Sequence, residues 1–161
     1  MVEYEKQKIY DSYSILVKMQ NWCAYQERSQ FDVRRKLSEF QISIEDKENI
    51  IVKLIEENFI NEERFALQFA KGKFSIKKWG RVKIRQELKQ KKVSDYCIKK
   101  ALEQIDDTTY LETLEYILTK KRATIKETNQ LKLKFKLINY ASSKGYELDL
   151  IQDALKNVLD K

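Results

Sequence analysis

Apolar residues recur at spacings of three and four positions along almost the whole chain, with polar and charged residues between them. This spacing places apolar side chains on one face of an α-helix, so it predicts a series of amphipathic helices and an all-α fold. Breaks in the pattern divide the chain into nine predicted helices. The predicted inward-facing residues of the first seven helices and the ninth are, in chain order, Tyr13, Leu16, Met19 and Trp22 or Cys23; Val33, Leu37 and Phe40; Ile50, Ile51, Leu54 and Ile55; Phe65, Ala66 and Phe69; Val82, Ile84 and Leu88; Cys97, Ile98, Ala101 and Leu102; Leu111, Leu114 and Ile117 or Leu118; Leu150, Ile151, Leu155 and Val158.

Polar residues mark several predicted helix starts, because a side-chain oxygen can accept a hydrogen bond from a free backbone amide there. The predicted starts lie at Ser29, Asn61, Ser94 and Thr109, the last with Glu112 as a capping box. Gly72 is predicted to end the fourth helix and Gly145 the eighth, since glycine readily adopts the left-handed conformation that follows a helix.

The apolar positions also repeat over a longer period. A shift of 51 residues superimposes Val33, Leu37 and Ile42 on Ile84, Leu88 and Val93, and a further shift of 53 reaches Leu137, Ala141 and Tyr146. The second shift also matches Ile98 with Ile151, Ala101 with Ala154 and Leu102 with Leu155. Three tandem three-helix repeats are therefore predicted, at 1–58 (with an N-terminal extension), 59–106 and 107–161, forming an elongated, curved array.

The amino-acid composition supports a helical fold and indicates the cellular compartment of the protein. Proline is absent and glycine occurs three times, which removes the usual helix breakers and hairpin turns. Cys23 and Cys97 fit no disulfide or zinc-ligand spacing, so both are predicted to be reduced core residues. No apolar run approaches a membrane span, and the first residues lack the apolar region of a secretory signal. A cytoplasmic monomer is expected.

Histidine is also absent, which excludes serine–histidine and cysteine–histidine nucleophiles and histidine metal sites. The chain contains no glycine-rich phosphate loop. We therefore expect a protein that is not an enzyme and has no cofactor and no metal.

Positive charge is concentrated in one segment, which we call the basic segment (71–92). It contains ten basic residues and one acid, a net charge of +9, whereas the whole chain carries +7. The ten are Lys71, Lys73, Lys77, Lys78, Arg81, Lys83, Arg85, Lys89, Lys91 and Lys92. A lesser basic stretch comprises Lys120, Lys121 and Arg122, followed by Lys126, Lys132, Lys134 and Lys136.

Two runs around the basic segment resemble the RecX family of regulatory proteins of bacterial recombination. The first is FINEERFA at 59–66, where the family commonly has tyrosine-isoleucine-aspartate-aspartate, and the second is GRVKIRQELKQKKV at 80–93. The second run is similar to the family pattern G-x-x-R-I-x-x-E-L-x-x-K-G-I, with Lys83, Lys92 and Val93 replacing arginine, glycine and isoleucine. Near the C-terminus, the run SKGY at 143–146 followed by Ile151 resembles the family's R-G-F-x-x-x-x-I.

The resemblance implies three helical repeats and a non-enzymatic modulator that binds the RecA recombinase and its DNA filament, usually suppressing its activity. Three interpretations of the basic segment stay open: a solvated helix face, a contact with DNA phosphates, and a contact with an acidic groove of the filament. Trp79 could stack on a base or simply pack in the fold. The alternatives to a recombinase regulator are a general nucleic-acid-binding helical protein and an adaptor unrelated to DNA.

Overall fold

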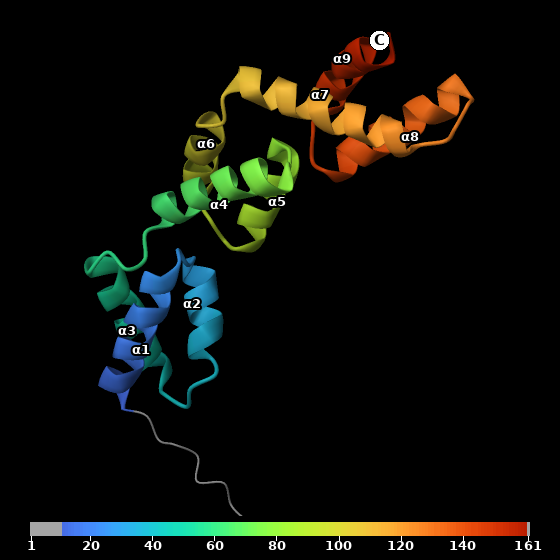
Figure 1. Ribbon diagram of the computed structural model, residues 1–161. Coiled ribbons are helices and arrows are strands. Elements are labelled where there is room, and N and C mark those ends of the chain that lie inside the picture. The colour runs from blue at the N-terminus through green and yellow to red at the C-terminus, as the bar shows by residue number, and fades with distance from the viewer. Residues whose placement is uncertain (1–10, 161) are drawn as a thin grey trace, which may run out of the picture. The chain divides into compact units, whose positions relative to one another are not determined.

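The computed structural model describes residues 11–160, which form nine α-helices and no strand (Figure 1). The prediction of an all-α fold is therefore confirmed. The helices are α1 (Ser12–Tyr25), α2 (Gln30–Leu37), α3 (Ile44–Glu56), α4 (Glu62–Lys77), α5 (Arg81–Gln90), α6 (Asp95–Glu103), α7 (Asp107–Thr124), α8 (Gln130–Ser143) and α9 (Leu148–Leu159). Within this part of the chain, no helix combines the length and apolar character needed to cross a bilayer.

The described residues divide into two compact units, 11–65 and 66–160. The division falls inside α4, close to the predicted end of the first repeat. The second unit contains most of α4 together with α5 to α9. The repeat boundaries at 58 and 106, and the elongated, curved form of the array, stay predictions.

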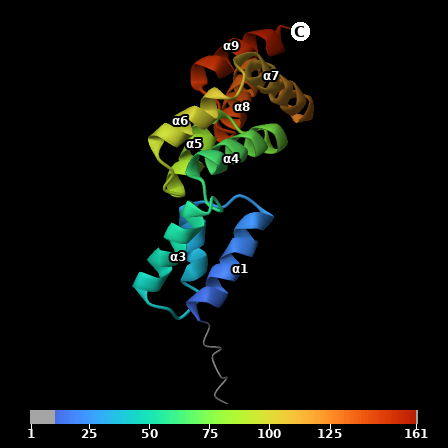
Figure 2. The ribbon, with the colours of Figure 1, turned by 90° about the vertical axis from the view of Figure 1, so that its left-hand side faces the viewer.

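The first unit is a three-helix bundle in which α3 packs against both α1 and α2 (Figure 2). Its buried residues are Ile15, Met19, Cys23, Val33, Leu37, Ile50, Ile51, Leu54 and Ile60. Ser29 caps α2 as predicted, because its hydroxyl accepts a hydrogen bond from the Asp32 amide and the Asp32 carboxylate accepts one from the Ser29 amide.

Two predicted core positions of this unit are wrong. Tyr13 is 75% exposed, and Ile15 takes the inward position on α1. Ile55 on α3 is also exposed, beside the fully buried Leu54. In both cases two apolar residues lie close together on the helix, and only the phase of the packed face decides which one is buried.

In the second unit, α5 packs against α6, and α7 packs against both α8 and α9. The residues matched by the 53-residue shift are all buried, namely Ile84, Leu88, Val93, Ile98, Ala101, Leu102, Leu137, Ala141, Tyr146, Ile151, Ala154 and Leu155. Equivalent positions in the two halves of this unit thus make equivalent cores. Ser94 caps α6, and Gly145, at φ 95°, follows the end of α8, both as predicted.

The predicted end of α4 at Gly72 is wrong. The helix continues through Gly72 to Lys77, because one glycine costs a helix only about 1 kcal/mol and the packing of Phe65, Ala66 and Ala70 exceeds that cost. The helix ends where Lys78 adopts φ 59° and the Trp79 amide donates to the Lys73 carbonyl.

The predicted capping box of Thr109 and Glu112 is also wrong. Helix α7 begins at Asp107, and Asp106 is its cap, accepting a hydrogen bond of 2.9 Å from the Thr109 amide. Tyr110 consequently faces inward, and Leu111, predicted to be buried, is 42% exposed.

Candidate partner and nucleic-acid interface

The basic segment runs from the second half of α4 through the α4–α5 turn and α5 to the turn after it. Its residues do not form one uniform exposed face. Five of the ten are exposed, namely Lys71, Lys77, Arg85, Lys89 and Lys92. The other five are half-buried, namely Lys73, Lys78, Arg81, Lys83 and Lys91. Several of these side chains contact the rest of the fold, so the segment has a structural role as well as a charge.

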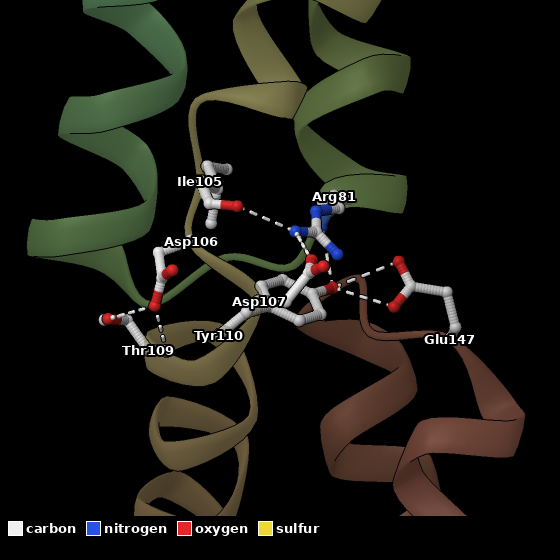
Figure 3. Close-up of polar contacts among 7 residues, drawn as sticks. All are labelled: Arg81, Ile105, Asp106, Asp107, Thr109, Tyr110 and Glu147. Atoms are coloured by element: carbon white, nitrogen blue, oxygen red, sulfur yellow. Dashed lines mark hydrogen bonds and ion pairs between the residues drawn. The ribbon is translucent and has the colours of Figure 1, made fainter.

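Arg81 is held by contacts inside the second unit (Figure 3). Its guanidinium donates to the Ile105 carbonyl at 2.9 Å and to Asp107 Oδ1 at 2.6 Å, and it lies 4.2 Å from the centroid of the Tyr110 ring. Only 22% of the side chain is exposed. Arg81 therefore ties the start of α5 to the start of α7.

Tyr110 lies beneath this arginine and is almost fully buried. Its hydroxyl accepts a hydrogen bond of 3.0 Å from the Arg81 amide and donates to the Glu147 carboxylate, whose two oxygens lie at 2.9 and 3.0 Å (Figure 3). Burial raises the pKa of Tyr110 well above its ordinary value, and the Glu147 charge adds to that effect. Sequence reasoning missed Tyr110, although its spacing of four from Leu114 is the pattern of a core residue.

Trp79 follows α4 and is half-buried. The ammonium groups of Lys73 and Lys83 lie 4.9 and 4.4 Å from the centroid of its ring. The indole therefore supports two lysines of the basic segment, which favours the packing role over base stacking for this residue.

Tyr116 lies in the second half of α7, and the Lys120 ammonium lies 5.1 Å from the centroid of its ring. Lys78 and Lys120 both lower the pKa of the Tyr116 hydroxyl, Lys120 by a hydrogen bond and its charge and Lys78 by its charge alone. These two lysines come from different basic stretches of the sequence. Tyr116 is 49% exposed, so the charges of both stretches act on a tyrosine at the surface.

Tyr140 on α8 extends the same arrangement. The ammonium groups of Lys121 and Lys144 lie 4.9 and 5.9 Å from its ring centroid, and Lys144 Nζ also donates to the Lys77 carbonyl at 3.5 Å. We call this set the lysine–tyrosine cluster; its members are Lys77, Lys78, Tyr116, Lys120, Lys121, Tyr140 and Lys144. Sequence reasoning missed Lys144 and both tyrosines, because no spacing along the chain brings them together.

A surface hollow adjoins the cluster at the C-terminal end of α7. It is lined by Lys121, Thr124, Ile125, Lys126, Lys136, Asn139 and Tyr140. Two lysines of the lesser basic stretch thus lie beside the cluster. Arg122 differs from them, since its Nη1 donates to the Val158 carbonyl and braces α7 against α9.

Two lysines of the basic stretches form ion pairs. Lys136 pairs with Glu127 at 3.5 Å, and Lys89 pairs with Asp95 at 3.6 Å. Among residues 11–160, no group of three or more histidine, cysteine, aspartate or glutamate residues could hold a metal ion. The chemistry that this surface offers is therefore electrostatic attraction of an anionic partner, with aromatic rings among the cations.

Comparison with known families assigns the two halves of the second unit. Residues 61–102 match the model of the second three-helix domain of RecX, and residues 108–155 match the model of the third. The chain belongs to the RecX family. The predicted tandem three-helix repeat is thereby confirmed, with α4–α6 and α7–α9 as the second and third domains.

Curated relatives agree with this assignment. The chain is 23% identical over 141 residues to proteins named "Regulatory protein RecX" from Bacillus thuringiensis (strain Al Hakam) and Bacillus cereus (strain AH187). The match covers 88% of this chain and 52% of each relative, so the chain spans about half the length of these relatives. Both relatives are named as regulatory proteins.

Solved structures share the fold. A crystal structure titled as regulatory protein RecX has a TM-score of 0.82 and 21% identity, covering 93% of this chain and 72% of its own. The crystal structure of RecX from Lactobacillus salivarius has the same TM-score and identity, covering 91% of this chain and 96% of its own. At this identity the likeness establishes the fold, including the first three helices.

Proposed function

We propose that this chain is a non-enzymatic regulator of homologous recombination and DNA repair. It binds the RecA recombinase on its DNA filament, and it inhibits ATP turnover and strand exchange there. It acts as a monomer in the cytoplasm, without a cofactor. Membership of the RecX family supports the regulatory role. The observation that carries the filament contact is the link between the two basic stretches, in which Lys144 donates to the Lys77 carbonyl and, with Lys121, flanks the Tyr140 ring.

The contact proposed here combines all thirteen basic residues predicted from the sequence with Lys144. Lysines that neutralise phosphates release condensed counterions, and this gives an affinity that does not depend on base sequence. Within the set, Arg81 and Arg122 make internal hydrogen bonds that hold α7 against its neighbours. Their main contribution is therefore to position the lysines of the cluster.

Inhibition follows if the chain binds one state of the filament better than another. A protein that spans neighbouring recombinase protomers would hinder the rearrangement that accompanies ATP turnover, or would shift the filament toward disassembly. Moving such an equilibrium from 1:99 to 99:1 requires roughly 5.5 kcal/mol of differential affinity. An extended contact with many cations is suited to supply a difference of this size.

The test is a titration of the chain into RecA filaments on single-stranded DNA, with ATP hydrolysis followed continuously. We expect hydrolysis to fall in a saturable manner, and we expect the chain alone to hydrolyse no ATP. Unchanged hydrolysis at saturating chain, with filaments intact, would contradict the proposed inhibition.

A general nucleic-acid-binding role is the second candidate. The cation-flanked tyrosines of the cluster favour it, because aromatic rings among lysines also suit single-stranded nucleic acid; Tyr116 is exposed and Tyr140 is half-buried. In that case the chain would inhibit hydrolysis only by competing with RecA for DNA. Added free DNA would then relieve the inhibition progressively, in proportion to the amount of DNA added.

A further inference from the structure

Helix α8 has two apolar faces. One face packs in the core through Leu133, Leu137 and Ala141, which are buried. The other presents Leu131 and Phe135, which are 65% and 59% exposed. These two residues are four positions apart, so they lie one above the other on the helix surface and form a continuous apolar stripe.

Lysines border this stripe on both sides. At 100° per residue, Lys134 lies on one side of the line through Leu131 and Phe135, and Lys132 and Lys136 lie on the other. All three are exposed, and α8 itself contains no acidic residue. Lys136 pairs with Glu127 at 3.5 Å, and Lys134 lines a hollow together with Asp153 and Asp160. The surface therefore has an apolar centre with a rim of lysine side chains.

The fold does not require the stripe to be apolar, because the opposite face of α8 supplies the core contacts. Single exposed leucines or phenylalanines are common on protein surfaces, but a paired set with a charged rim is typical of a protein-binding patch. A phosphate backbone would satisfy the lysines and leave Leu131 and Phe135 without apolar contacts. An amphipathic segment with apolar residues between acidic ones would satisfy both parts of the surface.

We propose that Leu131 and Phe135, with the flanking lysines of α8, form the docking surface for an acidic amphipathic segment of the recombinase protein. This proposal rests on the proposed function and assigns separate surfaces of the second unit to protein and to DNA. The α8 stripe contacts protein, and the lysine–tyrosine cluster contacts DNA.

The experiment compares the chain with its Phe135→Asp and Leu131→Asp variants, alone and combined. Tyr96→Asp is the matched control, because Tyr96 is 64% exposed on a different helix, α6. Binding to RecA filaments is measured by co-sedimentation, and binding to naked single-stranded DNA by fluorescence anisotropy, both at the same salt concentration. Far-UV circular dichroism checks that each variant is folded. If an aspartate variant does not fold, Phe135→Gln is used in its place.

We expect each single α8 variant to weaken filament binding about ten-fold, as the loss of a central apolar contact does in protein interfaces, and the double variant to weaken it further. Naked-DNA binding should change less than about two-fold, because these changes lie outside the cluster. Tyr96→Asp should leave both affinities unchanged.

Five results would overturn the proposal. Folded α8 variants that bind filaments as tightly as the unchanged chain would exclude docking at the stripe, and an equal loss with Tyr96→Asp would remove its specificity. A parallel loss of naked-DNA binding would assign the stripe to nucleic acid. Self-association of the unchanged chain that Phe135→Asp abolishes, seen by analytical ultracentrifugation, would assign it to a second copy. If the unchanged chain binds no filaments at all, both the proposed function and this proposal fail. In the other cases the unchanged chain still binds filaments, so only the docking proposal fails.

Discussion

The backbone of Gly80 lies directly against the backbone of Gly145, so that neither residue has room for a side chain. A Cβ atom on Gly80 would lie 2.3 Å from the Gly145 carbonyl oxygen, and one on Gly145 would lie 2.3 Å from the Cβ of Lys83. The Gly80 amide donates to the Lys144 carbonyl at 2.8 Å, and the Val82 amide donates to the Gly145 carbonyl at 3.0 Å. This contact joins the α4–α5 turn to the α8–α9 turn and fixes Lys77 and Lys78 beside Lys144.

Gly80→Ala should therefore destabilise the second unit by about 2–4 kcal/mol, because backbone atoms cannot move aside as a flexible side chain can. Gly72→Ala is the matched control. A Cβ atom at this helical glycine meets nothing within 4 Å, so the change should stabilise the chain by about 0.5–1 kcal/mol. Urea denaturation followed by circular dichroism measures both. Equal effects of the two substitutions would contradict the close contact.

Lys92 occupies a backbone conformation that glycine adopts more easily. Its φ is 61°, and it corresponds to Gly145 under the 53-residue shift and to the usual glycine of the RecX pattern. Lys92→Gly should stabilise the chain by about 1 kcal/mol, because a side chain in the left-handed region is strained. Arg85→Gly, in the middle of α5, should instead cost about 1 kcal/mol. Thermal denaturation should give shifts of opposite sign, and a loss of stability in Lys92→Gly would show that the conformation is not strained.

Because the Tyr110 hydroxyl is buried, we predict that the free energy of unfolding falls at alkaline pH. Burial raises the pKa of both Tyr110 and Tyr146 above the ordinary tyrosine value of about 10. A raised acid pKa in the fold means that the protonated form is favoured there. The resulting stability is fully present below pH of about 10 and is lost as the pH rises above it.

Tyr110→Phe should cost about 1–3 kcal/mol at neutral pH, because the Arg81 amide and the Glu147 carboxylate lose a buried hydrogen-bond partner. The variant should also lose less stability than the unchanged chain between neutral pH and pH of about 11. Urea midpoints measured across this range test the point, and parallel curves for the two proteins would exclude Tyr110 as the titrating group.

Much of the fold followed from the sequence, because helical periodicity and caps are local properties. The Ser29 and Ser94 caps and the buried equivalents of Ile84 and Leu88 are examples. The errors arose where the local pattern allows two outcomes, as with Leu111 beside Tyr110, or where packing overrides propensity, as at Gly72.

The candidate site was only partly predictable. The basic segment is visible in the sequence as an excess of charge. Its link to Lys121, through Lys144 and Tyr140, depends on the contact between the α4–α5 and α8–α9 turns. That contact joins residues more than sixty positions apart, and no local pattern encodes it.

Charge reversal should separate contact residues from structural ones. Reversal of Lys77, Lys78 and Lys120 to glutamate should leave the fold intact, because surface substitutions usually change stability by only about 0.5 kcal/mol. If each contacts one phosphate, the slope of log affinity for single-stranded DNA against log salt should become shallower by roughly 2. Anisotropy titrations at several salt concentrations measure the slope.

Arg81→Glu should behave differently. It should lower the free energy of unfolding by about 2–3 kcal/mol, since it removes two internal hydrogen bonds between the start of α5 and the start of α7. A variant with all three lysines reversed that binds DNA and filaments as before would show that the cluster is only a solvated surface. Normal stability of Arg81→Glu would argue against the bracing role of the arginine.

The most direct test of the central claim is a pull-down of the chain on RecA filaments compared with naked single-stranded DNA at the same salt concentration. We predict that the filament retains at least ten-fold more of the chain than the same length of naked DNA, because it offers protein and phosphate surfaces together. Equal retention on both would contradict a recombinase partner and leave a general nucleic-acid-binding protein. Retention on neither would contradict both functions.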